Sequence, residues 1–205
     1  LYAAKCHYNV GSGPHVSSEE NQQHLKEELH RQSVVREAVN RFIENAKSLK
    51  VSVYDIKVAD AFLFIVSDGM RKGHSWLVDP LVEGGKFRKF SGTNEAGSNG
   101  ADLAGRTCDA FAHFSYFDSQ GTVVFVDLQG WFPFKRTSSH YLTLYDTMIH
   151  SSQVLFGLGD QGQLGVDEFV SQHTCNSICR ALGLTDVTEM SLKFSSGPDP
   201  DDKDK

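Results

Sequence analysis

The sequence feature that most constrains the fold is the heptad HTCNSIC at residues 173–179, which holds two of the four cysteines of the 205-residue chain. The surrounding stretch VDEFVSQHTCNSICRAL indicates one helix that Gly183 ends. On such a helix Cys175 and Cys179 are four residues apart, so both sulfurs lie on one face, and His173 stands just before them. Thiolate and imidazole groups are ligands of tetrahedral zinc, so the heptad predicts a metal site that ties this helix to another segment.

Three ligands do not close a structural zinc site, and the fourth must come from elsewhere in the chain. His113, in the segment AHFSYF, and Cys108 are the two upstream candidates. The alternative interpretation is that Cys175 and Cys179 are small buried hydrophobic residues, as free cysteines usually are. A C-x-x-x-C spacing is less specific than paired C-x-x-C motifs, so the spacing alone leaves the two interpretations evenly balanced.

Composition limits the class of protein. A length of 205 residues suits one large domain or two small lobes with a shared core. The net charge of -6 argues against a general nucleic-acid binder. No apolar run approaches the length of a membrane span; the longest, AFLFIV at 61–66, suits a buried strand. Four cysteines make no disulfide scaffold, so we expect an intracellular, cytoplasmic protein. Because the chain starts with Leu1, we also expect a fragment of a longer protein.

A long helix is the clearest local prediction. Ser17 and Glu20 form an S-x-x-E capping box that opens a helix through about Leu49. Its apolar face is Leu25, Leu29, Val35, Phe42, Ala46 and Leu49. Strands are expected in LYAAKCHY, AFLFIV, SWLVDPLV, TVVFVDL and, less clearly, QVLF; a second helix surrounds DAFAHFSYF. A surface loop covers residues 91–105, and residues 193–205 form a disordered acidic tail.

The order of motifs resembles that of the alpha-kinases, a family of atypical protein kinases. The family pattern has a His before an aromatic residue and a Tyr, a V-D-L-Q-G strand end, an F-G-x-G segment and H-x-C-N-x-x-C. All four occur here in order between FAHFSYFDSQGTVVFVDLQG and FGLGDQGQLGVDEFVSQHTCNSIC. Upstream, YAAKC resembles the strand that carries the family's nucleotide lysine, and LVDPLVEGGKFRKF resembles its linker. The resemblance covers most of the chain.

The resemblance implies a two-lobed α+β kinase domain with a truncated N-lobe. Residues 1–80 are then the remainder of the N-lobe with the long helix, and residues 81–192 are the C-lobe with structural zinc. The implied zinc ligands are His113, His173, Cys175 and Cys179. The implied activity is ATP-dependent phosphorylation of serine or threonine in a protein substrate. The rival is a non-catalytic, zinc-stabilised pseudokinase or protein-binding module.

The resemblance also assigns roles in phosphoryl transfer. Lys5 holds the α- and β-phosphates of ATP, and Asp127 positions or deprotonates the substrate hydroxyl. Gln129 and Asp146 bind Mg²⁺, and Asp79 stands in the linker beside the adenine, where a glutamate is usual. Independently of the family, Asp127 and Gln129 alternate at the end of the strand VVFVDLQ, so both side chains should point to one side. Carboxylate and amide oxygens suit a hard cation.

The run GLGDQG also fits the G-x-G-x-x-G pattern of dinucleotide-binding folds. No strand with an acidic end follows the next helix, so the dinucleotide interpretation fails. By resemblance Gly157, Gly159 and Gly162 form a substrate-side loop, in which Asp160 replaces the usual asparagine. Lys5 is almost the first residue, so we expect that the strands which precede this lysine in the family are missing from this fragment. We therefore expect the fragment to bind ATP weakly.

Overall fold

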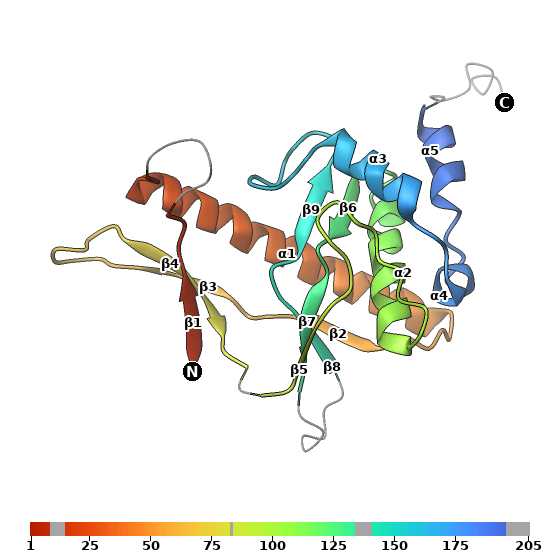
Figure 1. Cartoon of the computed structure of the whole chain (residues 1–205), viewed down its shortest axis with the longest axis horizontal. Coiled ribbons are helices and arrows are strands. Elements are labelled where there is room, and N and C mark those ends of the chain that lie inside the picture. Colours follow the sequence, from red (N-terminus) through yellow and green to blue (C-terminus); the bar gives the residue numbers. More distant parts are fainter. Residues whose placement is uncertain (9–14, 83, 134–140, 196–205) are drawn as a thin grey trace.

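The computed structural model describes residues 1–8, 15–82, 84–133 and 141–195. Its longest element is helix α1 (Ser18–Ser48), which runs from the sheet near the N-terminus to helix α2 (Figure 1). The predicted capping box is present, because Ser17 Oγ accepts from Glu20 N and Glu20 Oε2 accepts from Ser17 N. Leu25, Val35, Phe42 and Ala46 are buried as predicted, whereas Leu49 is exposed.

The N-terminal sheet has the strand order β1-β4-β3 and is antiparallel throughout. Its strands are β1 (Tyr2–Lys5), β3 (Phe62–Ile65) and β4 (Ser75–Pro80), all three predicted. The expectation that AFLFIV is buried is wrong, because three of the four residues of β3 are exposed. The central strand β4 contacts α1, and Leu77 at its middle is fully buried. This packing fixes β1, and therefore Lys5 at its end, close to α1.

Two further sheets are linked by two connections of the chain, one from β6 to β7 and one from β8 to β9. One has the order β2-β8-β7-β5, with β2 parallel to β8, and the other pairs β6 with β9. Their bounds are β2 (Asp55–Val58), β5 (Lys86–Lys89), β6 (Val123–Val126), β7 (Gln129–Phe132), β8 (Tyr141–Leu144) and β9 (Met148–Ser151). The chain leaves β6 for β7 and returns from β8 to β9, so it changes sheet at two neighbouring corners.

Four helices complete the C-terminal part of the molecule: α2 (Leu103–Asp118), α3 (Gln163–Gln172), α4 (Ser177–Ala181) and α5 (Val187–Ser195). Helix α2 packs against β6, α4 and α5 (Figure 1). The core joins both halves of the chain, because Phe42 of α1 stacks edge-to-face on Phe111 and Phe114 of α2. Among the described residues, no helix combines the length and apolarity needed to span a membrane.

The structure corrects several local predictions. QVLF is not a strand, since Val154 has a left-handed backbone with φ 55°. The stretch VDEFVSQHTCNSICRAL is two helices, because His173 is extended (φ -66°, ψ 130°) and Asn176 caps a new helix by accepting from Ile178 N and Cys179 N. Helix α5 covers the first three residues of the expected tail, and residues 196–205 lie outside the described residues.

Candidate functional site

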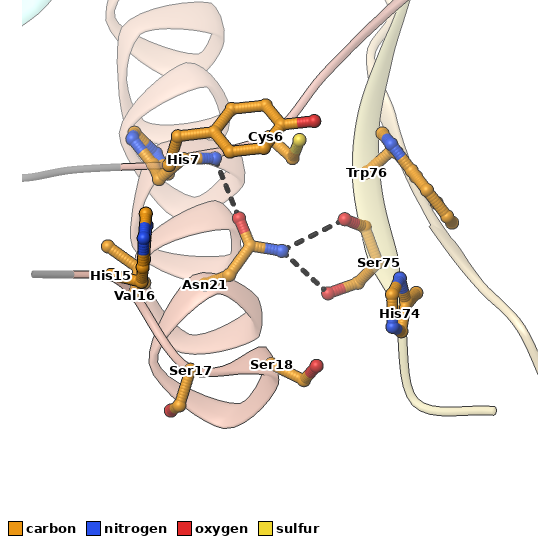
Figure 2. Close-up of a pocket in the computed structure, with 11 residues that line it drawn as sticks. Cys6, His7, His15, Val16, Ser17, Ser18, Asn21, His74, Ser75 and Trp76 are labelled. Atoms are coloured by element: carbon orange, nitrogen blue, oxygen red, sulfur yellow. Dashed lines mark hydrogen bonds between the residues drawn. The ribbon is translucent and has the colours of Figure 1, made fainter. Parts of the chain in front are cut away.

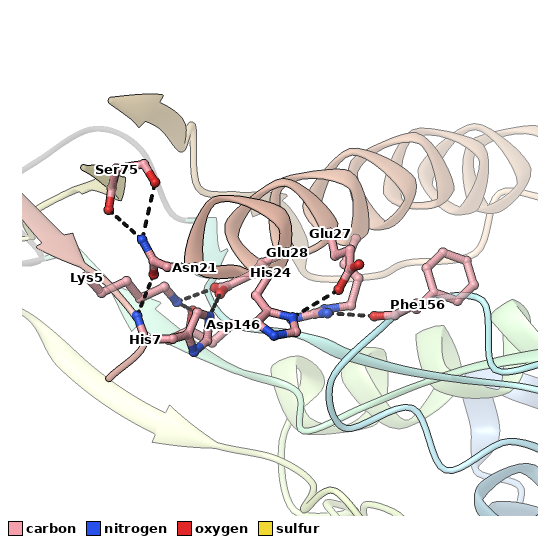
Figure 3. A network of polar contacts seen from close by, with 10 residues as sticks. Lys5, His7, Asn21, His24, Glu27, Glu28, Ser75, Asp146 and Phe156 are labelled. Carbon is pink, nitrogen blue, oxygen red and sulfur yellow. Dashed lines mark hydrogen bonds and ion pairs between the residues drawn. The ribbon is translucent and has the colours of Figure 1, made fainter. Parts of the chain in front are cut away.

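Lys5 is the centre of a charged network between β1, α1 and the corner after β8 (Figure 3). Its Nζ forms ion pairs with the carboxylates of Glu28 on α1 and of Asp146. Burial by itself lowers the pKa of Lys5, but the charges of Glu28 and Asp146 outweigh it and raise that pKa. Lys5 is therefore held as a cation, in contact with a buried carboxylate on one side and with Asp146, whose side chain is half exposed, on the other.

Asn21 fixes the chain that follows Lys5. Its Oδ1 accepts from His7 N at 2.8 Å, and its Nδ2 donates to the carbonyl and hydroxyl oxygens of Ser75 at 2.9 and 3.2 Å (Figure 2). The buried amide thus ties the chain after β1 to β4 through α1. A cavity of about 400 Å³ lies here, lined by Cys6, His7, His74 and Trp76 among others. It lies beside the Lys5 network, and neither Lys5, Asp127 nor Asp146 lines it.

Two other cavities meet at Lys5, Gln129 and Asp146, which line both of them. The first, of about 320 Å³, is completed by β4, β5, β7 and Tyr145; its further lining residues include Asp79, Phe87, Trp131 and Tyr145. The second, of about 420 Å³, is completed by α1, by the corner between β6 and β7, and by the segment that contains Gly157, Gly159 and Gly162, here called the glycine segment. Its further lining residues include Glu28, Arg31, Asp127 and Gly159. One cation and one carboxylate therefore stand where an aromatic-walled cavity joins a charged one.

The two corner aspartates come together because β6 pairs with β9 and β7 pairs with β8. Val126 lies opposite Met148 and Gly130 lies opposite Leu144, so Asp127 and Asp146 occupy the two matched corners between these pairs. Both have left-handed backbones with φ 52°. Strain of this kind at non-glycine residues is concentrated at functional sites.

Asp127 is held in place by its main chain and its side chain. Its N–H donates to Gly92 O at 2.9 Å, and its Oδ1 lies 2.6 Å from Lys89 Nζ. The prediction that Asp127 and Gln129 alternate on one strand is wrong, because β6 ends at Val126 and β7 begins at Gln129. Both residues nevertheless line the charged cavity.

Asp79 lies on β4 opposite Ala3 and lines the aromatic-walled cavity. It is 9% exposed, and burial raises the pKa of its carboxyl.

The glycine segment has the left-handed backbone that its sequence suggests. Gly157, Gly159 and Gly162 have φ of 72°, 87° and 68°. A Cβ on Gly159 would lie 2.0 Å from Met148 Cε, and one on Gly157 would lie 2.3 Å from Glu27 Oε2. Only Gly159 of the three lines the charged cavity. The segment is also held to α1, because Arg31 Nη1 donates to Phe156 O at 2.6 Å.

The His/Cys residues of the heptad converge with His113 of α2 although they do not share one helix. One ligand atom from each of His113, His173, Cys175 and Cys179 lies within 4.8 Å of every other. Cys175 Sγ is 3.5 Å from His113 Nδ1, and Cys179 Sγ is 3.8 Å from His173 Nε2. Cys108 is buried and is not part of this group. His113 is thus the upstream residue that meets the heptad.

The chemistry of this cluster fits a bound cation. Thr185 O accepts from His113 Nε2 at 2.8 Å. The proton of the ring is therefore on Nε2, and the lone pair of Nδ1 faces Cys175 and can ligate a metal ion. Burial lowers the pKa of His173 to about 4 and raises the pKa of the Cys179 thiol to about 12. The His173 imidazole is therefore neutral at pH 7 and can ligate a metal ion, and a thiolate at Cys179 needs a cation beside it.

Sequence reasoning missed three residues of the charged network: Glu28, Arg31 and Lys89. The signal for Glu28 was available, since it follows Leu25 by three residues and precedes Gln32 by four on the buried face of α1. A carboxylate on that face needs a partner. Lys89 gave no such signal, because its partner Asp127 is at the corner between β6 and β7, far from Lys89 in sequence.

Comparison with known proteins identifies the family. The family model described as the alpha-kinase family matches residues 2–179. The chain belongs to the alpha-kinase family. Among curated alpha-kinases, it is 34% identical to myosin heavy chain kinase B of Dictyostelium discoideum over 126 residues, 60% of this chain and 15% of that protein. It is 31% identical to alpha-protein kinase 1 of the same organism over 168 residues, 75% of this chain and 12% of that protein.

Solved alpha-kinase domains share the fold. The crystal structure of the alpha-kinase domain of myosin-II heavy chain kinase A in complex with AMP-PNP matches with a TM-score of 0.63 and 25% identity. The match covers 82% of this chain and 59% of that domain. This member of the alpha-kinase family therefore spans a small part of its curated relatives and about three fifths of the solved domain.

Proposed function

We propose that this chain is the catalytic part of an ATP-dependent protein kinase that phosphorylates serine or threonine. The observation that carries the proposal is the contact of Lys5 with Asp146 where the two cavities meet. A cation for phosphates beside oxygen ligands for a metal ion is the constellation that phosphoryl transfer needs. The complex of a structural relative with AMP-PNP supports a nucleotide as a ligand of this fold.

Gln129 and Asp146 are the proposed Mg²⁺ ligands. The amide oxygen and the half-exposed carboxylate line both cavities, and such oxygen donors suit this cation. Bound Mg²⁺ neutralises phosphate charge during the transfer. Lys5 then contacts the phosphates while Glu28 keeps its ammonium group in place from the buried side.

Asp127 is the proposed residue that orients the substrate hydroxyl and takes its proton. The hydroxyl oxygen forms the new bond to the γ-phosphorus as the bond between that phosphorus and the bridging oxygen of ATP breaks. Asp127 lines the charged cavity beside Gly159, so the hydroxyl approaches from the side of the glycine segment. Gly157, Gly159 and Gly162 are accordingly the proposed substrate side.

The nucleoside belongs in the aromatic-walled cavity. Phe87 and Trp131 pack with ring centroids 5.4 Å apart on paired strands, and Asp79 adds a buried carboxyl to the same cavity. A base with apolar faces and polar edges matches this lining. Residues 1–80 and 81–192 are the proposed lobes, except that β2 pairs with β8 and so belongs to the sheet of the second lobe. Lys5 comes from the first lobe and Asp146 from the second.

The His/Cys cluster is proposed to hold a structural zinc ion. His113, His173, Cys175 and Cys179 supply four nitrogen and sulfur donors and leave no position for a substrate, as in structural sites. Such an ion joins α2 to the chain between α3 and α4. Two ligating thiols must remain reduced, which supports an intracellular, cytoplasmic location.

Transfer of label from γ-labelled ATP to the protein itself and to an array of serine and threonine peptides tests the proposal. Wild type should transfer phosphate in the presence of Mg²⁺, and Asp127→Asn should lose transfer while keeping its melting temperature. Asp60→Asn is the matched control, since that side chain is exposed and Asp60 lines neither of the two cavities. Absence of transfer by a folded, metal-loaded wild type favours the non-catalytic binding module.

A further inference from the structure

His150 of β9 joins two segments that no motif connects. The side chain is fully buried, its Nε2 lies 2.8 Å from Thr93 O, and its Nδ1 accepts from Gln161 N at 3.2 Å. A carbonyl oxygen only accepts and a backbone N–H only donates. The ring is therefore the neutral tautomer with its proton on Nε2.

The ring has no freedom to move away from this position. A Cβ built on Gly165 of α3 would lie 2.4 Å from the His150 ring, so the glycine admits the imidazole by having no side chain. Gln161 is bound a second time, because its Nε2 donates to Asn94 Oδ1 at 2.6 Å. The loop at residues 91–96 and the glycine segment are thus joined by two independent contacts, one through His150 and one through Asn94.

The first residues of the same loop hydrogen bond to the corner that contains Asp127. Gly92 O accepts from Asp127 N, and Ser91 Oγ accepts from Leu128 N, both at 2.9 Å. The chain of contacts from Asp127 through the loop to His150 ends at Gln161, between Gly159 and Gly162. One end of this series of hydrogen bonds fixes the position of Asp127, and the other end fixes the position of the glycine segment.

We propose that His150 is a positioning residue that fixes the glycine segment relative to Asp127, with Thr93 and Gln161 as its two separate contacts. The proposal rests on the function proposed above, because it assigns Asp127 to the reacting hydroxyl and the glycine segment to the protein substrate. His150 touches neither substrate. It acts by holding two pieces of the site in register.

Two substitutions separate the two contacts. In His150→Gln the side-chain amide replaces Nε2 as the donor to Thr93 and leaves Gln161 N–H without an acceptor. In His150→Asn the shorter side chain offers its oxygen to Gln161 and cannot reach Thr93. His74→Gln is the matched control, because His74 is exposed and stands just before β4 of the N-terminal sheet.

Kinetics are measured with a threonine peptide selected on the wild-type protein. His150→Gln should raise KM for the peptide about tenfold and leave kcat and KM for ATP within about twofold, since it releases only the glycine segment. His150→Asn should lower kcat about tenfold, since it releases the loop that holds Asp127. Identical kinetic profiles for the two variants, or changes in melting temperature with unchanged kinetics per folded molecule, would overturn the proposal.

A second readout does not need turnover. Nitrogen NMR should find the proton of His150 on Nε2, and exchange of the Gln161 amide should be at least tenfold faster in His150→Gln than in His150→Asn. If wild type shows no phosphoryl transfer but exchange differs in this way, the proposed function fails and the positioning of the glycine segment stands. Equal exchange in both variants overturns the role of His150 whatever the activity.

Discussion

Asp160 offers the sharpest test of how the glycine segment is built. Its two carboxylate oxygens accept four hydrogen bonds, and the residue is 9% exposed. Oδ1 accepts from Ser151 N and Gly162 N, and Oδ2 accepts from Ser151 Oγ and Phe156 N. The family resemblance places an asparagine here, so Asp160→Asn looks conservative. The structure says that it is not.

The cost of Asp160→Asn follows from counting acceptors. An asparagine keeps the oxygen that serves Ser151 N and Gly162 N and turns an NH₂ group toward Phe156 N, which is also a donor. The Ser151 hydroxyl can rotate and accept, whereas the Phe156 N–H cannot. A buried donor left without a partner costs about 1–3 kcal/mol. We expect a loss of about 2 kcal/mol, or about 4–8 °C in melting temperature for a chain of this size.

Thermal melts as a function of pH give the assay. Burial alone raises the pKa of Asp160, but the bonds from Ser151, Gly162 and Phe156 outweigh it and hold that pKa below its ordinary value. Its contribution is therefore fully present above the unfolded pKa of about 3.9 and is lost as the pH falls through the folded value. The gap between wild type and Asp160→Asn should close below about pH 4.

Asp167→Asn is the control for Asp160→Asn, because Asp167 is exposed on α3 and its only hydrogen bond among those found in the described residues comes from Gln163. It should melt within about 2 °C of wild type, as surface substitutions usually do. Equal stability of Asp160→Asn and wild type at pH 7 would refute the assignment of four accepted bonds.

Three further predictions concern the zinc cluster and the nucleotide site. Cys179→Ala should yield aggregated protein without zinc by metal analysis, whereas Cys108→Ala should keep stoichiometric zinc; a soluble, metal-free Cys179→Ala with unchanged melting contradicts the cluster's role. Glu28→Gln should weaken Mg·ATP binding at least tenfold by calorimetry, because it leaves the Lys5 ammonium without its buried partner; unchanged affinity rejects that role. Trp131→Ala should raise KM for ATP while KM for peptide stays constant, and the reverse pattern would move the nucleoside to the other cavity.

Local signals were read correctly where the determinant lies within one segment. The capping box at Ser17 and the apolar face of α1 depend on residues three and four apart, and the helix begins where they place it. Strands β1, β3, β4 and β6 each have an apolar or β-branched run of their own. The prediction that His113 joins the heptad residues rested on the family pattern and not on the spacing of the residues.

The rest depends on tertiary contacts that no short segment records. Strands β7, β8 and β9 are four residues each, and corners at Asp127 and Asp146 separate them from their neighbours in sequence. The spacing within the heptad is that of one continuous helix, but residues 173–176 are not helical and Asn176 caps a new helix. This interruption lets His173, Cys175 and Cys179 approach His113. A pattern of spacing cannot show such a break.

The most direct test of the central claim is whether Mg·ATP binds where Lys5 meets Asp146. Thermal melts of the purified protein should show a stabilisation of about 2.7 kcal/mol at a hundredfold excess of Mg·ATP over its Kd. The shift should vanish when Mg²⁺ is omitted and in Asp146→Asn, and it should persist in Asp60→Asn. No shift in wild type, or an equal shift in Asp146→Asn, would contradict the assignment of this junction as the nucleotide site.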